Sequence, residues 1–267
     1  MESYISQKLN GRFKPIVLLK TDEIPENVIG PKSGRGGCVM SFVAQTIAKR
    51  KITFYKRENA RCGGIFPGFG WGDSFENEDA KDFQATFLSC GAESAKDKED
   101  FLKKIENRPP NVKQMFSEGE RIDADWQTAY ENISSRPIYD DEKHVVFKPL
   151  EELSDGEIPE SVIFTVNSFE LMLLLQLDGS HRADSNYVMV PQASACQSLG
   201  CFVFEQNEKE NPHMVLGPVD LSARKHMKHF IPLDYVTLAL PWKLFLKQEE
   251  ISKKSLFQSS LLSDLMD

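Results

Sequence analysis

The chain has 267 residues, of which 40% are hydrophobic and 27% charged, and its formal net charge is −8 at pH 7. These values are typical of a soluble globular protein with a sizeable core. The acidic excess argues against nonspecific nucleic-acid binding, and it gives no reason to expect an anionic membrane surface as a partner.

The N-terminal residues 1–9 are polar and lack the apolar region of a secretory signal. The longest apolar run, near residues 171–177, is too short to span a membrane. No pair of cysteines has the CxxC spacing of a zinc ribbon or a thioredoxin-type motif. We therefore expect a cytoplasmic protein whose five cysteines are mostly reduced: Cys38, Cys62, Cys90, Cys196 and Cys201.

The first part of the chain alternates strands and helices. Residues 15–20 form a short apolar run that predicts a buried strand. The glycine-rich residues 32–37 follow, with Lys32 and Arg35, and predict an anion site at the start of a helix, although a turn that only needs glycine is the alternative. Apolar side chains at helical spacing predict that helix over 38–49, and residues 52–55 predict a second strand.

Residues 75–135 are rich in charge and predict a helical insertion, with helices near 77–88, 95–105, 111–118 and 123–132. In the second half we expect strands at 145–147, 161–166, 187–190, 214–217 and 235–240. Helices are expected at 169–176, 220–229 and 242–250, with Asn167 or Ser168 capping the first and Asp220 the second. Residues 194–205 begin as a helix, although 202–204 also fit a strand.

These elements predict a mixed α/β fold: one compact domain over residues 1–252, with a mixed sheet flanked by helices, and a C-terminal tail over 253–267. The segments 14–74 and 144–250 share a similar order of strand, small-residue turn, helix and strand. They are either two related α/β halves or the result of ordinary α/β alternation.

The segment most indicative of function is residues 61–72, in which five of twelve residues are glycine and three are large aromatics. Cys62 lies beside Arg61, whose charge favours a thiolate, and Gly63 and Gly64 leave room for a ligand. Cys62 is therefore the candidate nucleophile, with a structural role as the alternative. Phe66, Phe69 and Trp71 are expected to form the apolar walls of a cleft.

Other candidates lie at predicted helix starts. Cys38 and Cys196 occupy first turns, where the helix dipole lowers a thiol pKa, although each could equally be a buried apolar residue. Ser194 precedes Cys196, and Ser222 lies between Asp220 and Arg224, whose guanidinium suits a carboxylate or phosphate or, alternatively, a local ion pair with Asp220.

No metal site is predicted, because the cysteine spacings carry no ligand signature and the cysteines could converge only through the fold. His226 and His229 could face one ligand, but Lys225 and Lys228 alternate with them and indicate a solvated basic face.

The whole pattern resembles the DUF169 family of bacterial and archaeal proteins. The features that carry the resemblance are the strand over 15–20, the helix that begins at Cys38, the loop 61–64, the turn 190–196, the segment 220–224 and the closing strand that ends at Pro241. It covers roughly residues 14–250. The family has no assigned function and brings no catalytic residues. The resemblance implies one compact unit in which the cysteine–glycine loop and the Ser-Ala-Cys turn matter together.

The leading hypothesis is a protein that binds a small molecule or cofactor in one cleft. The residues expected around it are Arg61, Cys62, Gly63, Gly64, Trp71, Cys38, Ser194, Cys196, Ser222 and Arg224. One alternative is a cysteine-dependent redox or metal or iron–sulfur protein, and another is a non-catalytic interaction module that uses the aromatic loop. The expected partner is a small molecule, without nucleic acid or membrane, and a homodimer is left open.

Overall fold

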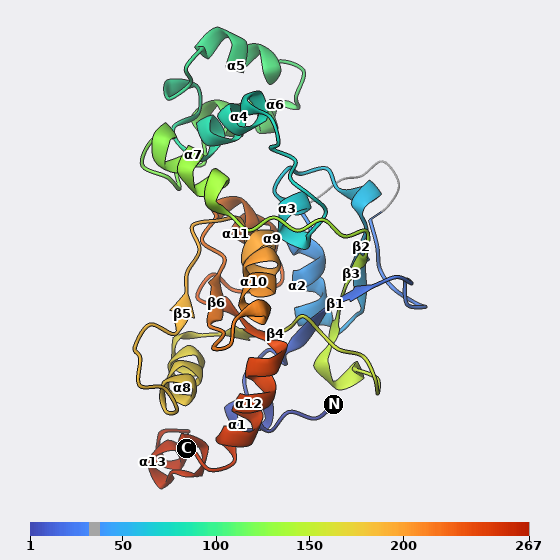
Figure 1. Ribbon diagram of the computed structural model, residues 1–267, viewed down its shortest axis with the longest axis vertical. Coiled ribbons are helices and arrows are strands. Elements are labelled where there is room, and N and C mark those ends of the chain that lie inside the picture. Colours follow the sequence, from blue (N-terminus) through green and yellow to red (C-terminus); the bar gives the residue numbers. More distant parts are fainter. Residues whose placement is uncertain (32–37, 267) are drawn as a thin grey trace.

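A sheet with strand order β2-β3-β1-β4-β7-β6-β5 runs through the molecule (Figure 1). The structure, a computed structural model, describes residues 1–31 and 38–266. All neighbouring strands are antiparallel except β5 and β6, which are parallel, so the sheet is mixed. The strands are β1 (Ile16–Thr21), β2 (Thr53–Tyr55), β3 (His144–Pro149), β4 (Ser161–Val166), β5 (Val188–Met189), β6 (Met214–Gly217) and β7 (Val236–Pro241).

The sheet is buried on both faces, which explains why its central strands are continuous apolar runs. In β1, Ile16 and Leu18 belong to one core, whereas Val17 and Leu19 belong to the other. Register is fixed by this alternation, because a shift of one residue would exchange the two faces.

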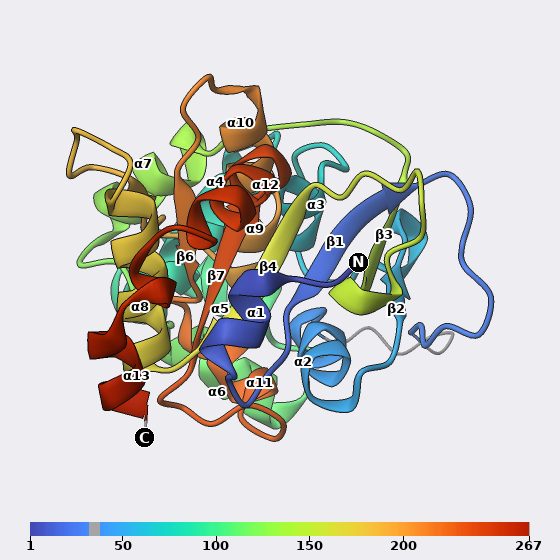
Figure 2. The same cartoon turned by 90° about the horizontal axis from the view of Figure 1, so that it is seen from below.

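Different helices cover the two faces. The first core packs against α2 (Met40–Lys49), α3 (Ile65–Phe69), α9 (Ala195–Leu199), α10 (Cys201–Glu208) and α11 (Leu221–Met227). The second packs against α1 (Tyr4–Leu9), α8 (Ser168–Gly179) and α12 (Trp242–Ser252), which lie toward the viewer in Figure 2. The predicted cap of α8 is confirmed, since Asn167 and Glu170 form a capping box.

Residues 75–135 form the predicted helical insertion, called here the helical unit, which lies beyond α3, α9 and α11 at the top of Figure 1. It has small apolar clusters of its own, one around Phe75 and Ile133 and another around Phe101. Its helices are α4 (Glu78–Leu88), α5 (Lys98–Lys104), α6 (Pro110–Glu118) and α7 (Trp126–Ser135), with a 3₁₀ turn over Gly91–Glu93.

The structure confirms a mixed α/β fold in a single compact domain and differs from the sequence-based expectation in three details. Residues 202–204 lie within α10 and are not a strand. Strand β3, from the predicted second half, lies between β2 and β1 of the first, so the two segments share one interleaved sheet. Residues 253–266 are not a separate tail, because they form a 3₁₀ turn and α13 (Ser260–Met266) and bury Phe257 and Leu262 in the second core.

Within the described ranges, no helix combines the length and apolar character needed to cross a lipid bilayer.

Candidate functional site

A pocket lies where the helical unit meets the rest of the domain. About 70 Å³ of it is open to small solvent molecules, well above the ~10–15 Å³ that one water molecule requires. Cys62 and Gly64 line it from the glycine-rich loop, and residues 192–194 and 220–222 contribute Ser194, Asp220 and Ser222. The helical unit contributes an opposing wall that includes Phe75, Phe87 and Glu120. Segments far apart in the sequence therefore meet at one recess, which Cys62 lines.

The glycine-rich loop approaches the turn at 194–200 very closely. A Cβ atom on Gly64 would lie 3.0 Å from Ser194 Oγ, and one on Gly200 would lie 1.8 Å from the carbonyl oxygen of Gly68. Glycine is required at position 200, because the backbone of Gly68 leaves no room for a side chain there, whereas Gly64 faces the side chain of Ser194. The cysteine–glycine loop and the Ser-Ala-Cys turn are therefore in direct contact.

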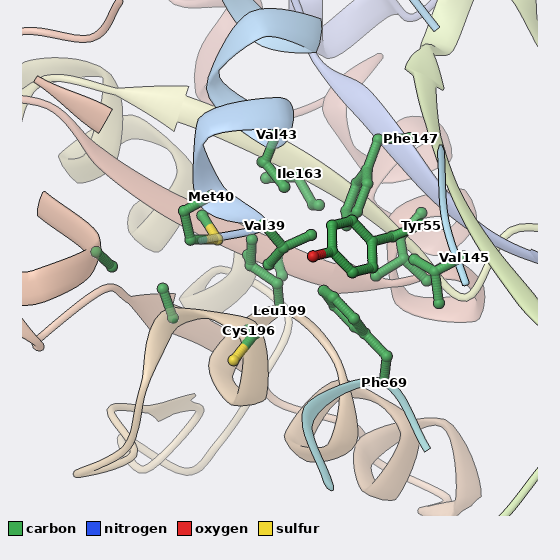
Figure 3. Packing of buried hydrophobic residues seen from close by; sticks show 14 of the residues in the cluster. Val39, Met40, Val43, Tyr55, Phe69, Val145, Phe147, Ile163, Cys196 and Leu199 are labelled. Carbon is green, nitrogen blue, oxygen red and sulfur yellow. The ribbon is translucent and has the colours of Figure 1, made fainter. Parts of the chain in front are cut away.

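The large aromatics of the loop do not line this pocket. Residues 65–69 form α3, and Phe69 and Trp71 are fully buried in the first core, where Phe69 points toward Tyr55 and Phe147 (Figure 3). The indole Nε1 of Trp71 donates to the carbonyl oxygen of Lys143 at 2.8 Å. Apolar burial, rather than contact with a ligand in this pocket, explains Phe69 and Trp71, and it also removes these two side chains from any exposed contact patch. Phe66 is partly buried and packs against the same core.

Ser194 and Cys196 tie the second turn to the loop. The thiol of Cys196 donates to the carbonyl oxygen of Gly64 at 3.1 Å, and Ser194 Oγ lies 3.4 Å from Cys196 Sγ. Burial raises the pKa of Cys196 well above that of an ordinary thiol. Cys196 is therefore a protonated structural donor at neutral pH.

Cys38 and Cys62 lie close enough to Cys196 for the three thiols to affect one another electrostatically. Burial raises the pKa of Cys38 to about 12, although the backbone N–H of Met40 opposes this shift. The expectation of a lowered pKa at the starts of α2 and α9 is therefore wrong, because the loss of hydration outweighs the helix dipole.

Cys62 is exposed at the surface as a residue. Its sulfur is nevertheless surrounded by protein atoms, which displace the water that would hydrate a thiolate. Burial is the largest cause of its raised pKa, and the carboxylates of Asp220 and Glu120 contribute further. The backbone N–H groups of Gly64 and Ile65 oppose the shift without reversing it.

Asp220 stands at the cap position of α11 as predicted, but its side chain serves a different helix. Its Oδ1 accepts a hydrogen bond from the backbone N–H of Ala195 at 2.9 Å, and Ser222 Oγ donates to Oδ2 at 3.3 Å. The backbone N–H of Ser222 donates to Glu120 Oε1 at 2.6 Å. Burial raises the pKa of Asp220 to about 6, and the charge of Glu120 adds to this effect.

The two predicted arginines are held by backbone carbonyl groups outside the pocket. Arg61 donates to the carbonyl oxygens of Glu58 and Ala60, both at 2.9 Å. Arg224 donates to the carbonyl oxygens of Tyr235 and Leu233. Gly63 packs against Phe75, since a Cβ there would lie 2.6 Å from the ring. The predicted anion site at 32–37 lies outside the described residues.

Two charged groups in and beside the pocket were not identified from the sequence. Arg136 lines the pocket just after α7, and its side chain is only 2% exposed. Its guanidinium lies 2.5 Å from Asp73 and over the ring of Phe75. Glu120, the carboxylate that faces Ser222, is the other. Neither stands in a motif, so only the fold brings them to the site.

Among residues 1–31 and 38–266, no three or more His, Cys, Asp or Glu side chains are arranged so that they could hold a metal ion.

The fold and the site define a mixed α/β protein with a pocket of apolar and polar side chains between a helical unit and a sheet-based body. Its sequence matches the model of the DUF169 family, described as an uncharacterised ArCR group, over residues 4–250. The chain therefore belongs to the DUF169 family. No curated protein and no solved structure shows significant similarity to it.

Proposed function

We propose that this protein binds a small molecule in the pocket between the helical unit and the body. The observation that carries the proposal is the convergence of Asp220, Ser222, Glu120 and Arg136 on one recess. Convergent polar groups beside aromatic side chains are the usual composition of a ligand site. Here the aromatic component is Phe75 and Phe87.

The size of the pocket limits the ligand. Its volume of about 70 Å³ is smaller than the ~300–1,000 Å³ of pockets that enclose drug-sized ligands. A compound of a few non-hydrogen atoms fits this conformation, and a larger one would have to extend into solvent or move the helical unit.

Binding is favoured over cysteine chemistry by the state of the thiols. A nucleophilic cysteine needs an available thiolate at neutral pH, whereas burial raises the pKa of Cys38, Cys62 and Cys196. A cysteine could act as a nucleophile in this pocket only if a ligand or partner lowered the pKa of its thiol.

A ligand in this pocket would also join two parts of the chain. The helical unit already contacts the body through Glu120, which accepts from Ser222, and through Ile122, whose carbonyl oxygen accepts from Gln192 Nε2 at 2.5 Å. A ligand between these contacts adds further bonds across the junction, so bound protein is expected to unfold at a higher temperature.

Thermal-shift screening with a library of small metabolites tests the proposal. In the variant Gln84→Trp, a bulky side chain replaces one that lines the pocket, so compounds that stabilise the unmodified protein should lose their effect. The matched control is Gln127→Trp, at an exposed position on α7 of the same helical unit, which should retain it. Stabilisation that persists equally in both variants would place the ligand elsewhere and contradict the proposal.

A further inference from the structure

We propose that the ligand of this pocket is a small organic ammonium compound that also carries an oxygen able to accept a hydrogen bond. This inference rests on the proposed function and names the chemical class of the molecule bound. It is drawn from the charges and the unused hydrogen-bonding capacity of the pocket wall.

The ammonium end is assigned to the carboxylates of Asp220 and Glu120. They lie on either side of Ser222, whose hydroxyl donates to Asp220 and whose backbone N–H donates to Glu120. In the part of the chain that the structure describes, neither carboxylate forms an ion pair. Two neighbouring carboxylates without an ion-pair partner favour a cation between them, since the charge of Glu120 opposes the ionisation of Asp220.

The acceptor end is assigned to Arg136. One guanidinium nitrogen, Nη2, is bonded to Asp73, but the buried Nε has no hydrogen-bond partner among the described residues. A buried donor without a partner is unfavourable, because it has lost its hydrogen bonds to water. An oxygen of the ligand that accepts from Nε would remove this cost on binding.

The charge balance selects a cation over a zwitterion. Arg136 is neutralised by Asp73 at 2.5 Å, so the charged groups of the pocket that have no ion-pair partner among the described residues are the carboxylates of Asp220 and Glu120. A ligand carboxylate near Arg136 would be repelled by Asp73, whereas a neutral carbonyl or hydroxyl oxygen would not.

Four small probes separate the parts of this proposal. Glycinamide carries both an ammonium group and a neutral acceptor oxygen. Ethylamine has only the ammonium group, and acetamide has only the acceptor oxygen. Glycine is the matching zwitterion. Each is titrated at pH 7 into ¹⁵N-labelled protein, and the amide resonances of Gly64 and Ser222 report on the pocket.

Glycinamide is expected to bind about tenfold more tightly than acetamide, and also more tightly than ethylamine and glycine, because a charged hydrogen bond contributes about that factor or more. The variant Glu120→Gln should weaken glycinamide about tenfold and leave acetamide unchanged. Glu118→Gln, an exposed change nearby in the chain, is the control. If Glu120→Gln does not fold, the order of the four probes on the unmodified protein decides the matter.

Three results would overturn the inference. Equal or tighter binding of acetamide would remove the ammonium requirement, and equal or tighter binding of glycine would contradict the charge balance. A third result is that neither glycinamide nor ethylamine binds, whereas a library compound does bind and Gln84→Trp blocks its binding. This result would refute the ligand class but leave the proposed function standing. If no compound of any class perturbs the pocket, both the class and the proposed function fail.

Discussion

Asp220 connects two helices that lie apart in sequence: its Oδ1 accepts a hydrogen bond from the backbone N–H of Ala195, 2.9 Å away. The bond joins the start of α11 to the start of α9, and it fixes the turn that faces the glycine-rich loop. Because Asp220 is only 3% exposed, the charge of its carboxyl group affects both the stability of the protein and the binding properties of the pocket.

The first prediction concerns the pH dependence of this carboxyl. Its pKa is about 6 in the folded protein against an ordinary value of 3.8, so its charge is unfavourable above pH 6 and this cost disappears as the pH falls toward 3.8. The full cost is about 3 kcal/mol, of which roughly half remains at pH 5. The groups that interact with it are Glu120, Arg224, Cys38, Cys62 and Cys196.

Asp220→Asn removes the charge and keeps an oxygen that can accept from Ala195. Raising the pH from about 5 to about 7.5 should therefore destabilise the unmodified protein by about 1 kcal/mol relative to this variant. Urea unfolding at the two pH values measures the difference, with the exposed Asp264→Asn as control. A difference of the opposite sign would show that the carboxyl is stabilised as an anion.

The second prediction concerns the backbone contact between α3 and α9. Gly200→Ala places a methyl group 1.8 Å from the Gly68 carbonyl oxygen, and the backbones must separate at a cost of about 3 kcal/mol. Gly156→Ala is the comparison, since that site has open space and a φ of +88°, so only backbone strain of about 1 kcal/mol is expected. Equal losses in urea unfolding would mean that this contact is not tight.

The third prediction concerns Cys62. Since the side chain is exposed but its pKa is raised, the thiolate fraction rather than access should limit alkylation. Its rate with iodoacetamide, followed by mass spectrometry, should be well below that of free cysteine at pH 7.5. Because the pKa of Cys62 is raised, the rate should still increase with pH beyond pH 8.5, where that of an ordinary thiol begins to level off. Rapid alkylation at neutral pH would revive the cysteine-dependent alternative.

The fourth prediction concerns the buried ion pair beside the pocket. Arg136→Met leaves Asp73 without its partner and should destabilise the protein by about 3 kcal/mol. Adding Asp73→Asn to this variant should recover part of the loss, because the uncompensated charge is removed. Chemical unfolding of the single and double variants measures the coupling, and strictly additive losses would show that the pair contributes nothing as a pair.

The sequence was informative where local rules decide the outcome. Apolar runs located β1 and β4, helical spacing located α2, and the cap at Asn167 was recognisable from its residue type. These elements are determined by burial patterns and capping that operate within a few residues.

Features that depend on the fold could not be obtained in this way. The sequence predicts that Trp71, in a glycine-rich loop, contacts a ligand, but the side chain is buried in the core and its indole N–H donates to the carbonyl oxygen of Lys143, just before β3. Glu120 and Ser222 are 102 residues apart and meet only through the docking of the helical unit. The thiol pKa values follow from burial, which outweighs the helix position that the sequence reveals.

The most direct test of the account is to map the binding site of the compounds that stabilise the protein in the metabolite screen. Amide resonances of ¹⁵N-labelled protein should move most at Gly64, Ser194 and Ser222, which line the pocket between the helical unit and the body, and these changes should be absent in Gln84→Trp. A compound whose largest effects lie on another surface, or a complete screen in which these three amides never move, would contradict the claim that this junction is a ligand site.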